Sequence, residues 1–468
     1  MPSSRTWGLP ILTLLSYPAA IESKAVLPIL WYPVLTHASI DDIALAKAAH
    51  IDAFALNAGY GQDESARSFH NAFTVASELD FKLFFSLDCS SDGHWPKDQV
   101  ISLLENYTTN EAYFRHTDGR ALVGTCEGFE AANDWPEIKK EVARAVGNET
   151  CCVLIPDWAS AGPEEVAKVS AIDGLMSWEA WPYGDEKMST TRDEEYMWFL
   201  GERSYIMPGD DLWYTRWQQV LELQLAYVEI LTWNDYGESH YIGPLRRDAT
   251  GVIAEGAPFD YVRGMEHDGW SRLLPYLIAK YKNGKNGKNG KDIDIEEALS
   301  VSYQLLSADA CDSGKTSGNS ETSHQAVMRP GDILQDRIFL LSRARGGCRL
   351  AIAVGDVNQS AQWTDTPDGA RGVYHGSTPF GGRVGEVVVT LSRAEKVLAQ
   401  MKGRAIDDRY LADHTNWNAW VGNATAVKRG GGGMGDGDEV GDTETGNGMA
   451  IQRASLWLTG LAFLSYLI

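Results

Sequence analysis

The stretch Tyr227-Val-Glu-Ile-Leu-Thr-Trp233, followed at once by Asn234-Asp-Tyr-Gly-Glu238, decides the fold class of this 468-residue chain. It is an apolar run that ends on amide and carboxylate side chains. Strands buried in a β/α barrel have this form, because the interior is apolar and the chemistry lies on loops at the C-terminal ends of the strands. The stretch therefore predicts a site as well as a fold.

Further apolar runs alternate with helical patterns along the first part of the chain. Strands are predicted over 25–31, 51–56, 82–87, 121–126, 153–156, 174–177, 204–207 and 227–232. Ser39 caps a predicted helix before the second strand, and another helix is predicted near 65–79. No Gly-x-Gly-x-x-Gly loop follows an early strand, which disfavours an open nucleotide-binding sheet. The pattern predicts an α/β fold, a closed (β/α)8 TIM-like barrel over 26–280.

A second, smaller domain is predicted after a low-complexity segment. The repeated Lys-Asn-Gly of 282–291 indicates a flexible linker over 281–294. Short alternating stretches at 337–341, 349–354 and 385–391 then predict a β-sandwich-like domain over 295–427.

The two ends of the chain resemble targeting segments. Residues 1–25 fit a secretory signal peptide, with Arg5 before an apolar stretch. Residues 428–454 form a Gly- and Asp-rich stalk, and 455–468 form an apolar tail too short to span a bilayer comfortably. Small residues around 446–448 make a glycosylphosphatidylinositol anchor signal the favoured interpretation of the tail, with a frayed amphipathic end as the alternative. We expect a secreted or cell-surface protein of the cell wall, bound to membrane only through such an anchor.

Composition limits the choice of partner. The formal charge of −23 would repel nucleic acid and anionic lipid and leaves a neutral polymer as a natural partner. The 16 Trp and 19 Tyr residues offer flat surfaces on which sugar rings stack, although large aromatics also fill protein cores.

Two further patterns agree with passage through a secretory pathway. Asn-x-Ser/Thr triplets, which mark possible N-glycosylation, occur at Asn106, Asn148, Asn358 and Asn423. The six cysteines have no zinc-type spacing, so disulfides are the simpler interpretation, with Cys311–Cys348 as the first pair expected.

Asp235 and Glu238 are the candidate catalytic pair. Cleaving a glycosidic bond needs one carboxylic acid to protonate the leaving oxygen and one carboxylate to activate water or attack the sugar. With Gly237 between them, a turn after the strand would direct both side chains toward one cavity. The alternative is that they cap the next helix or hold the barrel rim.

Other polar and aromatic residues lie near the predicted strand ends. Glu179 lies between Trp178 and Trp181, an arrangement that would suit a sugar subsite or an aromatic plug under a loop. His240 follows the acidic pair closely, although a lone histidine is more often a structural donor. The remaining residues of this kind are Asn57, Asp88, Glu127, Asp157, Asp211 and Trp233.

Four motifs resemble one known family. They are 51–57 (Ile-Asp-Ala-Phe-Ala-Leu-Asn), 178–182 (Trp-Glu-Ala-Trp-Pro), 209–214 (Gly-Asp-Asp-Leu-Trp-Tyr) and, most specifically, 229–244 (Glu-Ile-Leu-Thr-Trp-Asn-Asp-Tyr-Gly-Glu-Ser-His-Tyr-Ile-Gly-Pro). Together they resemble the fungal α-1,3-glucanases, or mutanases, of glycoside hydrolase family 71. The resemblance runs from about residue 39 to 280.

The resemblance implies an inverting, endo-acting hydrolase of α-1,3-glucan, with the acid and base roles on Asp235 and Glu238. The other strand-end residues would bind substrate. No metal or cofactor is implied, α-1,3-glucan would be the partner, and we expect a monomer. A catalytically inactive glucan-binding wall protein of the same fold and a hydrolase of another glucan linkage are the alternatives.

The chain departs from the family pattern in two places. The segment Ala25–Trp31 passes to Tyr32-Pro33 without the aromatic residues and histidine usual after the first strand. Met207-Pro208 joins Gly209 directly, where family members carry a long aromatic loop. Both changes would open the barrel or remove a substrate subsite, and an inactive protein is one expected consequence.

Overall fold

The computed structural model describes residues 24–31, 38–61, 65–90, 93–178, 189–200, 204–209, 213–237, 239–246, 260–284, 296–310, 334–367, 371–408, 416 and 418–426. The proposed signal peptide except its last two residues, most of the predicted linker, the stalk and the apolar tail lie outside these residues. Within them, no helix is long and apolar enough to cross a membrane.

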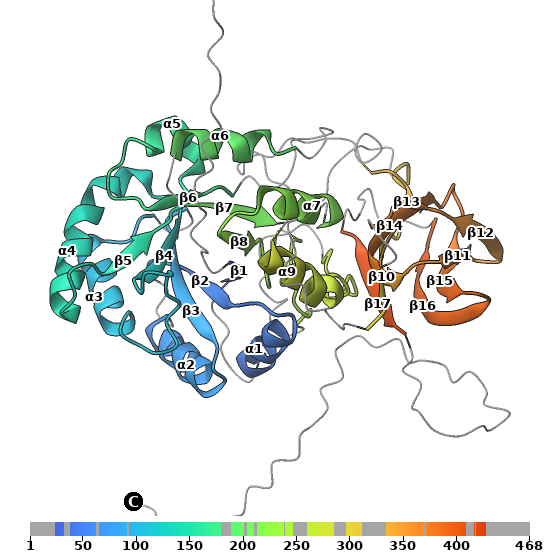
Figure 1. Ribbon diagram of the computed structural model, residues 1–468, viewed down its shortest axis with the longest axis horizontal. Helices are drawn as coiled ribbons and strands as arrows, with labels where there is room; N and C mark the ends of the chain where they lie inside the picture. Colours follow the sequence, from blue (N-terminus) through green and yellow to red (C-terminus); the bar gives the residue numbers. More distant parts are fainter. Residues whose placement is uncertain are drawn as a thin grey trace, which may run out of the picture.

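Eight parallel strands form one curved sheet in the first part of the chain (Figure 1). They are β1 (Ala25–Trp31), β2 (Ala53–Gly59), β3 (Lys82–Asp88), β4 (Ala121–Cys126), β5 (Cys152–Leu154), β6 (Gly174–Met176), β7 (Ser204–Gly209) and β8 (Tyr227–Ile230). Their order is β5-β4-β3-β2-β1-β8-β7-β6, so the first and eighth strands are neighbours. Asp157 follows β5, at one end of this order, and makes parallel bridges to Cys126 of β4 and to Met176 of β6, the strand at the other end.

Helices lie outside this sheet and alternate with its strands (Figure 1). They are α1 (Ala38–Ala48), α2 (Ser65–Glu78), α3 (Lys97–Tyr107), α4 (Trp135–Val146), α5 (Pro163–Val166), α6 (Thr191–Leu200), α7 (Trp213–Leu223) and α9 (Leu274–Asn283). Helix α4 shows why they form: Trp135, Ile138 and Val142 recur on one buried face. Pro136 at its start and Gly147, with φ of 71°, at its end set its limits.

Where burial is described, the parallel strands are buried on both faces, which explains their continuous apolar sequences. Every residue of β2 is buried, as is every residue of β3 after Lys82. Successive side chains of β3 point to opposite faces. Phe85 packs against Phe69 of α2 at 5.0 Å between ring centroids, so its face meets the helices. Ser86 on the opposite face bonds Asn57 of β2 and therefore faces the interior.

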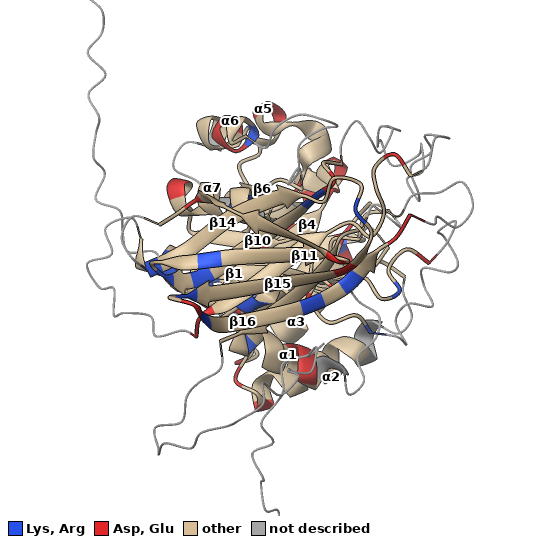
Figure 2. Ribbon diagram, turned by 90° about the vertical axis from the view of Figure 1, so that its right-hand side faces the viewer, with Lys and Arg blue, Asp and Glu red and all other residues tan. Residues whose placement is uncertain are grey.

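The C-terminal part consists of two antiparallel sheets over one core. One sheet has the order β13-β14-β10-β9-β17, and the other β12-β11-β15-β16. The strands are β9 (Ala298–Tyr303), β10 (Arg337–Arg345), β11 (Cys348–Val354), β12 (Val357–Ala361), β13 (Trp363–Asp365), β14 (Arg371–Pro379), β15 (Gly385–Arg393), β16 (Lys396–Ile406) and β17 (Trp420–Thr425). Buried and exposed residues alternate along β11, as expected for a sheet with one solvated face. Charged residues of both signs are spread over this end of the molecule (Figure 2).

The two parts share an apolar contact. Ala298, Leu341 and Val373 of the C-terminal strands belong to the same buried cluster as Leu277 of α9 and the residues of the parallel sheet. The ring of Tyr214, in α7, stacks on His375 of β14 with centroids 4.2 Å apart. The C-terminal domain is thus packed against the α7 and α9 side of the first domain (Figure 1).

The structure confirms all eight predicted strands to within three residues at each end and the three predicted strands of the C-terminal domain. Helix α9 continues to Asn283, into the segment predicted as linker. The predicted Cys311–Cys348 disulfide is wrong for this structure, because Cys348 carries a free thiol that donates to the carbonyl of Arg345. Cys311 lies outside the described residues, and the other four cysteines are also free.

Candidate active site

The C-terminal ends of the strands bring most of the candidate residues to one end of the parallel sheet. Asp88 is the last residue of β3 and is paired in register with Cys126 of β4, which is bridged in turn to Asp157. These three side chains therefore lie at one level of the sheet, and Asn57 lies one level below, beside Ser86. Four candidates, Glu179, Trp181, Asp211 and Glu238, lie outside the described residues.

Asp235 lies in a turn that directly extends β8. The backbone N–H of Trp233 donates to the carbonyl of Ile29 at 2.7 Å, which continues the pairing of β8 with β1. The chain then folds back, because the N–H of Thr232 donates to the carbonyl of His240 at 2.6 Å and the N–H of Ile242 to the carbonyl of Thr232 at 3.1 Å. These bonds close the chain around residues 234–237 and 239, which we call the catalytic turn because it carries the candidate catalytic residue Asp235.

Two side chains fix Asp235 within the catalytic turn. The hydroxyl of Thr232 accepts the N–H of Asp235 at 2.8 Å. The imidazole Nε2 of His240 lies 4.0 Å from the Asp235 carboxylate, whose side chain is 12% exposed. A carboxylate at this depth is largely sheltered from bulk water. The arrangement suits proton transfer, since low solvent access strengthens electrostatic interactions.

A buried carboxyl group that the sequence interpretation missed lies in the middle of β8. Glu229 is 3% exposed and is paired in register with Leu27 of β1 and Pro208 of β7. Burial, together with the charge of Asp157, raises its pKa well above the usual range. The neutral acid is therefore favoured. The sequence feature that could have identified Glu229 is a single acidic residue inside an otherwise apolar strand.

Asp88 and Asp157 are fully buried and already hold neighbouring loops. One carboxylate oxygen of Asp88 accepts both the N–H and the hydroxyl of Ser90, at 2.8 and 2.7 Å. One oxygen of Asp157 accepts the N–H groups of Ala159 and Trp178, both at 3.2 Å. Asp88 thus fixes the loop after β3, and Asp157 fixes the loops after β5 and β6. Trp178 itself is half-buried at the end of β6.

Asn57 presents a different kind of group. Its side-chain oxygen accepts the Ser86 hydroxyl at 2.9 Å, whereas its amide nitrogen is buried without a hydrogen-bond partner among the described residues. A buried N–H without a partner costs about 1–3 kcal/mol, so each such group calls for an explanation, and a functional role is one. Asn57 therefore remains a candidate for binding a sugar hydroxyl.

Two other candidates are placed away from the interior. The ring of Trp233 is 2% exposed, packs edge-on against Phe54 at 5.1 Å, and donates its indole N–H to Asp42 of α1. The carboxylate of Glu127 accepts the N–H and hydroxyl of Ser160. Both residues support the walls around the site, and substrate contact for them stays a prediction.

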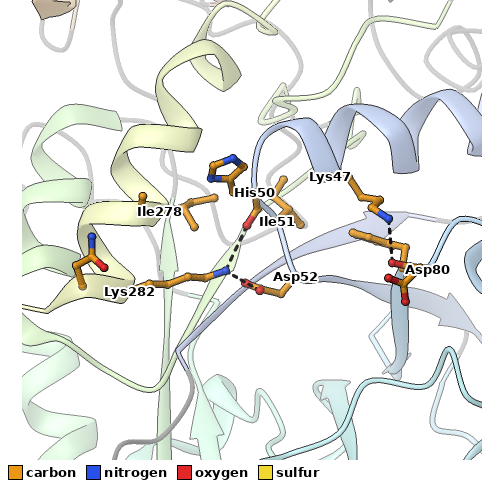
Figure 3. Close-up of a pocket in the computed structure, with 10 residues that line it drawn as sticks. Lys47, His50, Ile51, Asp52, Asp80, Ile278 and Lys282 are labelled. Atoms are coloured by element: carbon orange, nitrogen blue, oxygen red, sulfur yellow. Dashed lines mark hydrogen bonds and ion pairs between the residues drawn. The ribbon is translucent and has the colours of Figure 1, made fainter. Parts of the chain in front are cut away.

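The cavity shown in Figure 3 lies at the other end of the sheet. It has a volume of about 520 Å³ and is lined by residues that precede β2 and β3, including His50, Asp52 and Asp80, and by Lys282 of α9. Lys282 forms an ion pair with Asp52 at 2.6 Å, and Lys47 donates to the carbonyls of Leu79 and Asp80. These cations are already engaged by the protein, and none of the candidate residues lines the cavity.

The predicted glycosylation sites occupy varied positions. Asn106 in α3, Asn148 after α4 and Asn358 in β12 are exposed, whereas Asn423 in β17 is half-buried. Among the described residues, no three His, Cys, Asp or Glu side chains are grouped so that they could hold a metal ion.

Comparison with known proteins extends the resemblance over both domains. Residues 34–209 and 208–431 match the model of glycosyl hydrolase family 71. The two matched segments meet at 208–209, beside the junction where the sequence predicts a missing loop. The second segment continues through the C-terminal domain, well beyond residue 280.

Three curated relatives carry related names. Glucan endo-1,3-alpha-glucosidase agn1 of Schizosaccharomyces pombe is 28% identical over 424 residues, covering 84% of this chain and 91% of the relative. Mutanase Pc12g07500 of Penicillium rubens is 27% identical over 267 residues, covering 52% and 57%. Ascus wall endo-1,3-alpha-glucanase of Schizosaccharomyces pombe is 25% identical over 347 residues, covering 67% and 76%.

Among solved structures, a GH99 endo-alpha-mannosidase from Bacteroides thetaiotaomicron is similar with a TM-score of 0.42 and 11% identity, covering 56% of this chain and 98% of that one. A similarity of this size carries no argument about the fold. The family match does not depend on it. Because that match spans well over half of the sequence and both domains, this chain belongs to glycosyl hydrolase family 71.

Proposed function

We propose that this protein hydrolyses α-1,3-glucan by endo-cleavage. The observation that carries the proposal is the catalytic turn, which holds Asp235 at the C-terminal end of β8 with His240 beside it. The family match and the names of three relatives, each an endo-1,3-α-glucanase or a mutanase, support this substrate.

Asp235 and Glu238 would supply the acid and base of an inverting reaction. One carboxylic acid protonates the leaving oxygen while the other carboxylate activates a water on the opposite face of the sugar, at a separation of roughly 6.5–9.5 Å. The two residues are three positions apart in the sequence, a spacing that favours one short turn carrying both groups. Anomer analysis of the first product by NMR tests this: α-1,3-glucan gives a β-configured new end on inversion and an α-configured end on retention.

The parallel sheet would close into a complete (β/α)8 barrel, with the antiparallel domain as a β-sandwich. Asp157 supports closure, because it follows β5 at one end of the strand order and bridges to Met176 of β6 at the other end. The N–H of Met176 also donates to the carbonyl of Pro156 at 3.0 Å. The glucan would lie across the barrel mouth, in contact with the strand-end residues Asn57, Asp88, Glu127, Asp157, Trp178, Glu179, Trp181, Asp211, Trp233 and His240.

Reducing-sugar release from insoluble α-1,3-glucan, with β-1,3-glucan and starch in parallel, tests the proposed activity. We expect release from α-1,3-glucan alone, and as oligosaccharides of several lengths, since the cleavage is internal. Release from another polysaccharide would change the assigned linkage. Binding to α-1,3-glucan without release would contradict a catalytic role.

We further propose that the protein acts as a monomer at the cell surface, with residues 1–25 as signal peptide and 455–468 as a glycosylphosphatidylinositol attachment signal. The pattern of small residues, polar spacer and apolar tail supports the anchor. Deleting 455–468 is expected to move the protein from the membrane fraction into the medium. A truncated protein that stays on the membrane would contradict the anchor.

A further inference from the structure

The base of the catalytic turn is attached to the C-terminal domain through Tyr241. Tyr241 follows His240 directly and is fully buried. Its hydroxyl donates to the carbonyl of Met265 and accepts the side-chain amide of Asn418 at 3.3 Å. Asn418 lies just before β17 and is 6% exposed. Asn418 of the second domain therefore contacts Tyr241, two residues after the turn.

His267 makes a second connection between the same two segments. Its imidazole is 1% exposed and stacks on the Tyr241 ring with centroids 4.1 Å apart and planes 7° from parallel. Its Nδ1 lies 2.9 Å from the carbonyl oxygen of Tyr241, and its Nε2 lies 2.9 Å from the carbonyl oxygen of Ala419. One ring thus spans the distance from the turn to the segment before β17.

The opposite side of the turn is attached to the same segment. The hydroxyl of Tyr261 donates to the carbonyl of Gly237, inside the catalytic turn. The carbonyl of Tyr261 accepts the side-chain amides of Asn416 at 2.9 Å and Asn418 at 3.3 Å. Asn418 therefore reaches both sides of the turn, one through Tyr241 and the other through Tyr261.

We propose that His267 and Asn418 are positioning residues, through which the C-terminal domain sets the position of the catalytic turn for hydrolysis. The inference rests on the proposed function. Neither side chain contacts the reacting groups; each acts through Tyr241 or Tyr261. A displacement of about 1 Å at a catalytic group costs on the order of a hundredfold in rate. Contacts that hold the catalytic turn in position therefore affect the turnover rate. The second domain is then part of the active site's framework and more than an appended module.

The test compares four single variants with the natural sequence. His267→Leu removes the imidazole contacts with the carbonyls of Tyr241 and Ala419, whereas His267→Gln keeps a side-chain N–H donor. Asn418→Ala removes the hydrogen bonds from the side-chain amide to Tyr241 and Tyr261. Tyr214→Phe is the matched control, since it removes a hydrogen bond between the domains, to Asp365 of β13, without touching the segments attached to the turn. Each variant is assayed for kcat and KM on soluble α-1,3-glucan fragments and for thermal unfolding.

We expect kcat to fall by about 10- to 100-fold in His267→Leu and Asn418→Ala, with KM within about twofold of the natural value. His267→Gln should recover part of the loss, and Tyr214→Phe should keep its kcat. A purely structural role predicts lower melting temperatures with unchanged kcat per folded molecule, and that result would overturn the proposal. If His267→Leu does not fold, Asn418→Ala decides in the same way.

Hydrogen exchange separates this proposal from the proposed function. The amides of Thr232, Ile242 and Gly243 close the catalytic turn, and their exchange is measured without substrate. Faster exchange in the His267 and Asn418 variants, but not in Tyr214→Phe, supports bracing even if α-1,3-glucan is not the substrate. Unchanged exchange in those variants would contradict it. Absence of glucan hydrolysis by the natural sequence would contradict the proposed function alone.

Discussion

At the residue scale, burial in the interior of the sheet changes the protonation of Glu229. It is a buried carboxyl group whose pKa is raised by desolvation and by the nearby Asp157. An ionised carboxylate at this depth is costly unless it is paired, so the neutral form is favoured. The cost should be visible as a pH dependence of stability.

We predict that Glu229→Gln flattens the pH dependence of stability. The folded pKa of Glu229 lies above its unfolded value of 4.5. Its contribution is therefore complete below pH 4.5 and declines as the pH rises toward the folded pKa, because the folded state binds the proton more tightly. The amide is neutral throughout and lacks this decline. Melting temperatures from pH 4 to 8 should fall more steeply for the natural sequence than for Glu229→Gln. Parallel curves would contradict the assignment of Glu229 as a buried acid.

Residue identity at the site could be predicted from sequence only where a polar side chain follows an apolar run. Asn57, Asp88 and Asp157 were found in this way, and the strand ends bring them to one end of the sheet. Glu229 was missed because it interrupts a run instead of ending it. Trp233 was predicted to bind substrate; the contact of its indole with Phe54 and Asp42 could not be predicted, because it depends on the placement of α1.

At the element scale, the catalytic turn depends on close packing at its exit. A Cβ atom on Gly243 would lie 2.7 Å from both the ring and the carbonyl oxygen of Trp233. The ring is buried and the carbonyl accepts the N–H of Gly243 itself at 2.8 Å, so neither can move aside easily. Glycine is required here for close approach, not for an unusual backbone angle.

We predict that Gly243→Ala lowers the free energy of unfolding by about 1–3 kcal/mol, the usual cost of overpacking, and also reduces kcat because it displaces the turn. Chemical denaturation and steady-state kinetics measure the two effects. Gly124→Ala in β4 is the control, since its Cβ would meet neighbours at 3.6 Å or more, which is ordinary contact. Equal effects of the two substitutions would show that Gly243 has no special role.

Elements were the best-predicted level of this structure. The strands have continuous apolar sequences because both of their faces are buried, and this pattern is local in the sequence. The contacts that brace the turn were not predictable, since Tyr241 and Asn418 are 177 residues apart and only the packing of two domains brings them together. The free thiol of Cys348 was missed for a similar reason: Arg393, from a neighbouring strand, donates to its sulfur at 3.0 Å.

At the scale of the whole molecule, the two domains share buried surface. Leu341 and Val373 of the antiparallel domain lie in the same apolar cluster as Leu277 of α9. The guanidinium of Arg343 lies 5.4 Å from the ring centroid of Tyr276, also in α9. The N–H of Val421 donates to the carbonyl of Glu266 at 2.9 Å. Contacts of these three kinds couple the stability of one domain to the other.

We therefore predict that both domains unfold in one cooperative transition. Differential scanning calorimetry should give a single peak that coincides with the loss of near-ultraviolet circular dichroism, because exposing either domain also exposes the shared apolar surface. Tyr276→Ala, which removes one side of the cation–π contact, should lower the single melting temperature. Two separated transitions in the natural sequence would contradict this coupling.

The most direct test of the central claim is the rate of reducing-sugar release from α-1,3-glucan by the natural sequence and by Asp235→Asn. The substitution keeps the size of the side chain and leaves the bond from the backbone N–H of residue 235 to the Thr232 hydroxyl in place, so the melting temperature should hardly change. A catalytic carboxylate that moves a proton contributes about 100- to 10,000-fold to the rate, and we predict a loss of that size with the fold intact. Asp235→Asn that is folded and turns over glucan at the natural rate would contradict the assignment of the active site.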